Sequence, residues 1–478
     1  MRRIFVNDVC GAWQAVRGVC LVIALGVSLV AAGCSFGASE EPNVSPVAGS
    51  PGLGDPYFPN RGNGGYDVER YDIDVRWDAG TGSIEATTTI ELAFIDDLTS
   101  INLDFDGLTI TELTVDGNPA EYRRRSGELT VLFDTPVEDG ARSELAVSYQ
   151  GVPQTIPGPY NGNYGWRSRD DVITTINEPF GASTWYPVND HPTDRATYEI
   201  SVETPVDYTV ASNGQLVERQ EVGDNRAVWR WRSDDPMMAY LSGVTIGKFE
   251  VVEAETTSGL PVRSFLPSDR EVPQAVRDEI DRLPQLVEEL ETILGPYPFD
   301  SYGVTVLPTE LGTAFETQTN SLFGIDTAAD RTTMVHELAH QWFGNSVSID
   351  GWNEMWLKEG LATYVERLHR EAVDPTFDID RWALRLHGDV ESLPAPGDPG
   401  RTSMYDDEVY FRGALVVHAL RLTVGDTDFF ELLEEWAQRT TSESTATFAE
   451  FAASYGDPSV EQLVNTWVYE DRLPDLPG

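Results

Sequence analysis

The sequence is poor in lysine. Of its 33 basic residues only Lys248 and Lys358 are lysines, and 79 acidic residues bring the formal net charge to −46. Nucleic acid and anionic lipid surfaces are bound by basic footprints, so this balance argues against both as partners. The acidic excess favours solubility and attracts cationic ligands. With 41% hydrophobic residues over 478 positions, the chain has enough apolar material for two or three folded domains.

Cysteine is nearly absent. The chain has only Cys10, Cys20 and Cys34, so no cysteine lies beyond residue 34. We therefore expect neither a disulfide nor a thiolate metal site in the folded part, where a metal would be held by histidine and carboxylate groups. Apolar runs long enough to span a bilayer are also missing after residue 34.

The beginning of the chain has the pattern of an export signal. A basic start precedes the apolar, uncharged residues 18–33, which are typical of a signal peptide spanning residues 1–33. Residues 31–34 (AAGC) resemble a bacterial lipobox. That resemblance implies that Cys34 becomes the lipidated first residue of the mature chain.

The next segment, residues 34–65, is rich in glycine, proline, serine and asparagine and predicts a flexible tether. We therefore expect an exported protein, lipid-anchored to the outer face of a bacterial cell membrane and touching the membrane through that anchor only. A plain secretory signal, which would give a secreted protein, and an uncleaved anchor are the alternatives.

The remaining sequence changes character near residue 250. Residues 66–250 contain short segments of alternating apolar and polar residues, separated by turn signals, which predict an all-β domain built as a sandwich or saddle-like sheet. Residues 251–478 are dominated by helical spacing and predict a mainly helical domain. The order of the two parts indicates an α+β chain. Helical spacing is clearest in residues 330–343, 354–370, 409–424 and 427–439, and a further run over 276–294 contains Pro284.

Residues 336–340 read His-Glu-Leu-Ala-His, in a segment with helical spacing. Positions i and i+4 lie on one side of a helix, so His336 and His340 can present two imidazoles to one zinc ion. Glu337 lies beside them, where a carboxylate can act as general base on a water molecule. A buried helix with two hydrogen-bonded histidines is the alternative interpretation of the pentapeptide alone.

A third ligand is suggested by Glu359, which follows His340 after eighteen residues. A carboxylate is the usual companion of two histidines in a catalytic zinc site, where the fourth position is left for water. Glu354 is the alternative third ligand. The pattern therefore predicts one Zn²⁺ per chain.

This arrangement resembles that of the gluzincin aminopeptidases, the relatives of aminopeptidase N and leukotriene hydrolase. The resemblance covers roughly residues 66–478 and includes other motifs in the family's order. Residues 312–317 (GTAFET) are similar to the exopeptidase motif GAMEN. Residues 177–179 (NEP) and 185–192 (WYPVNDHP) are similar to the family's substrate-binding stretch. Residues 409–414 (VYFRGA) resemble the segment that holds the family's catalytic tyrosine.

The resemblance implies a thermolysin-like catalytic domain over residues 251–478 and a zinc-dependent aminopeptidase acting on peptides with a free N-terminus. Glu178 and Glu316 would bind the substrate's α-ammonium. Tyr410 would stabilise the oxyanion, with Tyr405 as a weaker second candidate. Zinc-activated water would attack the N-terminal peptide bond, with Glu337 as general base.

The sequence departs from the family pattern in several places. Thr313 and Thr317 stand where GAMEN has glycine and asparagine, and Ile176 stands where many relatives have glutamine, which predicts an apolar first side-chain pocket. The family's large C-terminal helical domain has no counterpart, so we expect a more open substrate cavity. The resemblance leaves open whether Glu366 or the segment near Glu354 receives a ring N–H of the ligating histidines.

Two other functions remain open at this stage. A zinc endopeptidase would share the metal site without needing an amine-binding pair, and a non-catalytic surface binding protein could use the same scaffold. The natural peptide, the preferred N-terminal residue and the oligomeric state are not indicated by the sequence.

Overall fold

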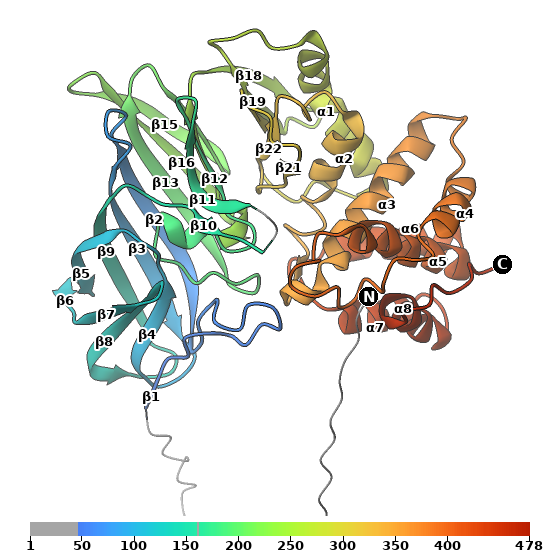
Figure 1. Ribbon diagram of the computed structural model, residues 1–478, viewed down its shortest axis with the longest axis horizontal. Coiled ribbons are helices and arrows are strands. Elements are labelled where there is room, and N and C mark those ends of the chain that lie inside the picture. Colours follow the sequence, from blue (N-terminus) through green and yellow to red (C-terminus); the bar gives the residue numbers. More distant parts are fainter. Residues whose placement is uncertain (1–45, 160–161) are drawn as a thin grey trace, which may run out of the picture. The chain divides into compact units, whose positions relative to one another are not determined.

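The computed structural model describes residues 46–159 and 162–478, which belong to one compact unit (Figure 1). The predicted signal peptide, Cys34 and the first part of the predicted tether lie outside the described residues. Within the described ranges, no helix is long and apolar enough to cross a membrane.

The largest β-sheet of the first part has eight strands. Its strands alternate buried and exposed side chains, as the sequence pattern predicts for a sheet with one face in the core. β13 runs parallel to β2, with Thr197 opposite Arg70, and the other pairs are antiparallel. The spatial order is β15 (Gln215–Val222), β16 (Arg226–Met238), β13 (Arg195–Pro205), β2 (Tyr66–Trp77), β3 (Ile84–Phe94), β9 (Arg142–Gly151), β5 (Thr109–Val115) and β6 (Asn118–Pro119).

Two smaller sheets complete this β-rich part. One consists of β1 (Val47–Ala48), β4 (Leu98–Asp104), β8 (Glu128–Val137) and β7 (Tyr122–Arg125). The other consists of β10 (Ile156–Pro157), β11 (Asn163–Arg169), β12 (Val172–Ile176), β17 (Val244–Gly247) and β14 (Thr209–Ser212). Every residue of β12 is buried, which places the loop that follows it in the interior.

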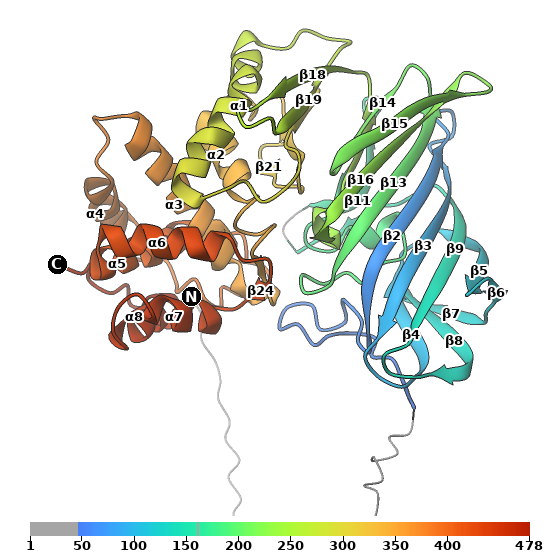
Figure 2. The ribbon, with the colours of Figure 1, turned by 180° about the vertical axis from the view of Figure 1, so that it is seen from behind.

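The second part begins with a five-stranded sheet and continues with helices. The sheet order is β18 (Phe249–Glu255), β19 (Pro261–Pro267), β20 (Val304–Leu307), β22 (Ser321–Gly324) and β21 (Ala314–Phe315). The helices are α1 (Gln274–Leu294), α2 (Arg331–Ala339), α3 (Trp356–Val373), α4 (Ile379–Asp389), α5 (Gly413–Val424), α6 (Asp426–Ala437), α7 (Thr445–Ala453) and α8 (Ser459–Tyr469). Short β23 (Ser348–Ile349) and β24 (Ser442–Glu443) pair with each other. Figure 2 shows α1 beside the β18–β19 hairpin, which it contacts.

The predicted α+β class is confirmed, with a β-rich first part and a helical second part. Helices α2, α3, α5 and α6 fall in the four segments with the clearest helical spacing. Pro284 lies inside α1 without ending it. The apolar face of α1, which includes Leu283 and Val287, is buried, and this packing offsets the hydrogen bond that a proline removes.

The predicted tether is wrong for residues 46–65, which are packed against the folded part. β1 pairs with β4, and Asp55 is 4% exposed. One carboxylate oxygen of this residue accepts hydrogen bonds from the backbone N–H groups of Tyr57 and Phe58, and the other accepts from that of Trp352, each at 2.8 Å. Glycine and proline content suggested flexibility, but composition does not reveal such specific long-range partners.

We predict that Asp55→Ala lowers the free energy of unfolding by about 2–4 kcal/mol, because three buried N–H groups lose their acceptor. Chemical denaturation of the variant and the parent measures the difference. Asp78→Ala is the matched control, since Asp78 also accepts from two backbone N–H groups, those of Gly80 and Thr81, but in an exposed turn. The control should cost less than about 1 kcal/mol; equal losses in both variants would contradict the prediction.

Candidate active site

Helix α2 carries the two histidines of the predicted metal site. Asp330 caps its beginning by accepting a hydrogen bond from the backbone N–H of Thr332. His336 lies in the last turn and His340 directly follows the final helical residue, so the two rings lie one turn apart on the same side. Their Nε2 atoms are 3.0 Å apart.

Helix α3 brings Glu359 to the same point. Its Oε2 lies 3.2 Å from His336 Nε2 and 3.3 Å from His340 Nε2. Gly360, the next residue, lets α3 approach α5 closely, because a Cβ at this position would lie 2.7 Å from the backbone of Gly413. The three predicted ligands thus present a triangle of atoms with sides of 3.0 to 3.3 Å.

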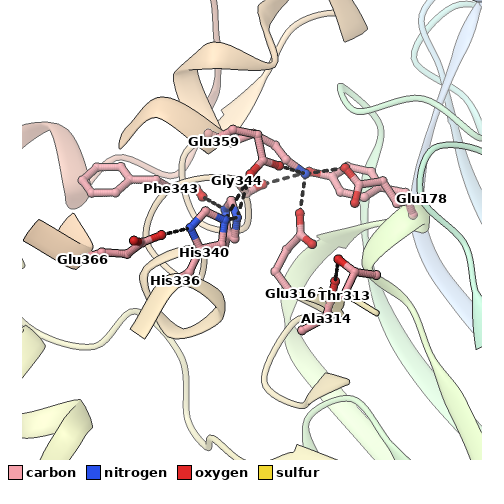
Figure 3. A network of polar contacts seen from close by, with 12 residues as sticks. Glu178, Thr313, Ala314, Glu316, His336, His340, Phe343, Gly344, Glu359 and Glu366 are labelled. Atoms are coloured by element: carbon pink, nitrogen blue, oxygen red, sulfur yellow. Dashed lines mark hydrogen bonds and ion pairs between the residues drawn. The ribbon is translucent and has the colours of Figure 1, made fainter. Parts of the chain in front are cut away.

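The other nitrogen of each ring decides what this triangle can bind. His336 Nδ1 donates to Glu366 Oε1 at 2.7 Å, and His340 Nδ1 donates to the carbonyl of Phe343 at 2.9 Å (Figure 3). In its neutral form, each ring then turns a lone pair on Nε2 toward the centre of the triangle. Because the carboxylate of Glu359 is also an acceptor, three acceptors face one another, and a cation is needed to stabilise them.

Zinc fits this donor set. A tetrahedral zinc ion with bonds of about 2.0–2.1 Å separates its ligand atoms by roughly 3.3 Å, which is close to the sides of the triangle. Two imidazoles and one carboxylate also match the donors of catalytic zinc sites, which keep one further position for water or substrate. The site accordingly suits one zinc ion held by His336, His340 and Glu359.

Glu337 and the three ligands line a cavity of about 340 Å³. Glu337 is 5% exposed, and burial raises the pKa of its carboxyl to about 8, against the opposing effect of His336. A carboxyl with this pKa both accepts and returns a proton near neutral pH. Its position beside the metal ligands therefore suits general acid–base chemistry.

Tyr410 also lines this cavity and comes from a π-helical turn formed by residues 408–412, just before α5. Its ring centre is 6.0 Å from that of His336. Burial raises the pKa of the Tyr410 hydroxyl well above its ordinary value, so the hydroxyl stays protonated and can donate a hydrogen bond. Tyr405 lines the cavity as well.

Two further carboxylates, those of Glu178 and Glu316, line this cavity. Glu178 follows β12, and Glu316 follows the edge strand β21. The backbone carbonyl of Glu316 accepts hydrogen bonds from the side chains of Asn345, at 2.7 Å, and Gln341, at 3.2 Å. These bonds join the end of β21 to the segment after α2, and they therefore fix the position of Glu316 relative to the ligating histidines.

Not all of the other predicted residues line the cavity. Thr313 lines the cavity, but Thr317 and Ile176 are not among its lining residues. Ile176 is 3% exposed within β12 and belongs to the core, so it does not form the predicted apolar pocket. Glu354, the alternative third ligand, accepts hydrogen bonds from the backbone and hydroxyl of Thr445 at the start of α7.

Sequence reasoning missed one contact and left another undecided. Lys358 forms ion pairs with Glu178 and Glu316, although the three residues are distant in sequence. The available signal was the rarity of lysine, since this residue is one of two in the chain. The partner of the His336 ring N–H is Glu366, about two helical turns along the face of α3 that carries Glu359.

Comparison with known protein families gives matches over both parts of the chain. The profile described as Peptidase M1 N-terminal domain matches residues 67–241, in the β-rich part. The profile described as Peptidase family M1 domain matches residues 316–467, which contain the metal ligands.

Named relatives include aminopeptidases from plants and animals. Aminopeptidase M1 of Arabidopsis thaliana is 25% identical over 452 residues, which cover 85% of this chain and 50% of the relative. Endoplasmic reticulum aminopeptidase 1 of Homo sapiens is 24% identical over 421 residues, covering 78% of this chain and 44% of that protein. The chain therefore spans about half the length of the curated relatives it matches.

Solved structures of similar length also match. A crystal structure of the M1 zinc metallopeptidase from Deinococcus radiodurans, bound to a Tyr-Ser-Ala substrate, aligns with a TM-score of 0.82 and 28% identity. The alignment covers 89% of this chain and 99% of the other. A related two-domain structure was solved with L-tryptophan bound, at a TM-score of 0.81. With both family profiles matched in order and the metal ligands in place, this chain belongs to peptidase family M1, the gluzincin zinc metallopeptidases.

Proposed function

We propose that the protein is a zinc-dependent aminopeptidase that hydrolyses the first peptide bond of its substrates. The observation that carries the proposal is that one cavity joins a His/His/Glu metal site, the buried carboxyl of Glu337 and the hydroxyl of Tyr410. The names of the relatives and the substrate in the aligned Deinococcus radiodurans structure support the same activity.

The residues around the cavity have distinct roles in this reaction. When bound, zinc supplies Lewis-acid polarisation of a carbonyl and lowers the pKa of water. Glu337 takes a proton from the attacking water and passes it to the nitrogen of the leaving amine as the C–N bond breaks. Tyr410 donates a hydrogen bond to the carbonyl oxygen as that oxygen gains negative charge. Glu178 and Glu316 form the subsite for the substrate's N-terminus.

The products of peptide cleavage distinguish this proposal from its two alternatives, a zinc endopeptidase and a non-catalytic binding protein. Incubation of zinc-loaded residues 35–478 with Tyr-Ser-Ala should release tyrosine and the dipeptide Ser-Ala, and a chelator should stop the release until zinc is restored. An endopeptidase would instead cut longer peptides internally without removing single residues. A binding protein would leave both kinds of peptide intact.

We predict that Glu337→Gln lowers kcat by about 10²–10⁴-fold while zinc content stays at one ion per chain, because the amide cannot take up the proton of water. Steady-state kinetics and elemental analysis measure the two quantities. Glu391→Gln, at an exposed position, is the control and should retain the activity of the parent. Activity near that of the parent in Glu337→Gln would remove this residue as the base.

We predict that Tyr410→Phe lowers kcat by about 10²–10³-fold with little change in KM, since the lost hydrogen bond forms mainly in the transition state. Tyr122→Phe is the matched control, because Tyr122 is 41% exposed in the β-rich part. If KM rose and kcat stayed constant, Tyr410 would be a residue that binds the substrate's ground state.

We also propose that the protein is exported and lipid-anchored through Cys34, on the strength of the signal-like residues 1–33 and the lipobox-like residues 31–34. In a bacterial host fed with labelled palmitate, the parent should acquire the label and sediment with membranes. Cys34→Ser should lose both properties. Labelling that persists in the variant would contradict the anchor at this position.

A further inference from the structure

The segment between β1 and β2 contacts two loops that each lead to the cavity. We call its residues 55–61 the strap; they precede residue 67, the first residue matched by a family profile. Figure 1 shows this segment, in blue, reaching from β1 toward the second part of the chain. Tyr57 and Phe58 are 7% and 4% exposed, and the carboxylate of Asp55 accepts hydrogen bonds from their backbone N–H groups. The strap therefore has a defined conformation with two buried aromatic side chains.

The first of the two loops carries Glu178. The ring of Phe180, two residues later, is 5% exposed and contacts two side chains of the strap. The Phe58 ring meets it edge-on, with 4.9 Å between the ring centres, and the guanidinium carbon of Arg61 lies 4.7 Å from the Phe180 ring centre. Arg61 is itself held by an ion pair of 3.1 Å with the buried Asp104. Because Phe180 is two residues from Glu178, these contacts restrict where the Glu178 carboxylate lies.

The second loop leads to Tyr410. The hydroxyl of Tyr57 donates a hydrogen bond to Asp398 Oδ1 at 2.8 Å and accepts one from the backbone N–H of Gly400 at 2.9 Å. From Gly400 onward, backbone hydrogen bonds of 3.0 Å, each spanning three residues, join residues 400, 403, 406 and 409. The last of these residues belongs to the π-helical turn that carries Tyr410. A continuous series of hydrogen-bonded turns therefore connects the Tyr57 hydroxyl to Tyr410.

Phe58 contacts both loops and a third segment. The guanidinium carbon of Arg401, in the second loop, lies 4.9 Å from the Phe58 ring centre. The ring of Trp352 also meets Phe58 edge-on, with 6.2 Å between the ring centres. Trp352 lies in the short helical turn just before α3, the helix that carries Glu359. The strap thus packs among three segments that each bring a side chain to the cavity.

We propose that the strap positions Glu178 and Tyr410 for the reaction, with Tyr57 and Phe58 as its positioning residues. The proposal rests on the aminopeptidase function proposed above. Phe58 acts on Glu178 through Phe180, so it affects how the substrate's N-terminus is bound. Tyr57 acts on Tyr410 through the turns after Gly400, so it affects stabilisation of the transition state. A misplacement of about 1 Å caused outside the site can cost roughly 10²-fold in rate, so contacts of this kind matter for turnover.

The first experiment compares Tyr57→Phe with the parent in cleavage of Tyr-Ser-Ala. The variant keeps the ring and loses both hydrogen bonds to the second loop, so kcat should fall about fivefold or more while KM changes less than about twofold. Tyr149→Phe is the matched control, since Tyr149 is 1% exposed and its hydroxyl is hydrogen-bonded to that of Thr88 within the eight-stranded sheet. An unchanged kcat in Tyr57→Phe, or an equal loss in the control, would overturn the role of Tyr57.

The second variant, Phe58→Leu, keeps an apolar side chain but removes the ring that contacts Phe180. KM for Tyr-Ser-Ala should rise about fivefold or more, with a smaller change in kcat. Phe94→Leu is the control, because Phe94 is 2% exposed and meets Phe133 edge-on, with 5.7 Å between the ring centres, in the β-rich part. A KM equal to that of the parent, or the same rise in the control, would overturn the role of Phe58.

A third measurement needs no turnover. Hydrogen exchange of the zinc-loaded proteins, followed by mass spectrometry, reports how firmly the turns after Gly400 are held. In Tyr57→Phe, the amides of residues 403–409 should exchange about tenfold faster than in the parent, while those of α1 keep their rates. Unchanged exchange at 403–409 would overturn the proposal. A parent that cleaves no peptide would refute the aminopeptidase function, whereas faster exchange in the variant would still show that the strap holds this loop.

Discussion

Buried negative charge is the constraint on which the whole site depends. Glu178, Glu316, Glu337 and Glu359 are each less than 10% exposed and line a single cavity. Carboxylates packed together in the interior are unstable unless cations or protons accompany them. Here a metal ion suits the side formed by the histidines and an ammonium occupies the other side, while burial raises the pKa of Glu337 and so favours its protonated form.

Local patterns explain how much of this arrangement could be predicted from the sequence. Two histidines four residues apart on a helix necessarily share a face, so His336 and His340 could be assigned to one ion from spacing alone. Glu359 required only the further assumption that a second helix packs on the first, and α3 does contact α2. Alternating residues likewise predicted the β-rich part, because an exposed face and a buried face impose a period of two on each strand.

Interactions between distant segments could not be predicted in the same way. The partners of Lys358 lie 42 and 180 residues away, and no periodicity relates them. Asp55 lies in a stretch whose composition suggests flexibility, yet its carboxylate caps a turn and binds the backbone of Trp352, 297 residues later. Ile176 is the opposite case, since its place beside a family-like motif predicted a pocket residue, whereas its side chain is buried in β12 and does not line the cavity.

The structure also joins the two parts of the chain at the candidate active site. Glu178 comes from the β-rich part and Glu316 from the sheet of the second part, and the ammonium on α3 binds both. Any movement between the two parts would therefore have to break a buried ion pair. This linkage gives the β-rich part a direct role in the geometry of the subsite that we propose for the substrate's N-terminus.

The scarcity of lysine has a practical consequence for covalent chemistry. Lys358 is enclosed, whereas Lys248 is exposed, so within the described residues an amine-reactive reagent meets one accessible lysine. A dye, crosslinker or solid support coupled through lysine would attach at the junction of β17 and β18, away from the residues that line the cavity. Coupling through Lys248 would therefore hold the folded part in one orientation and leave the lining of its cavity chemically untouched.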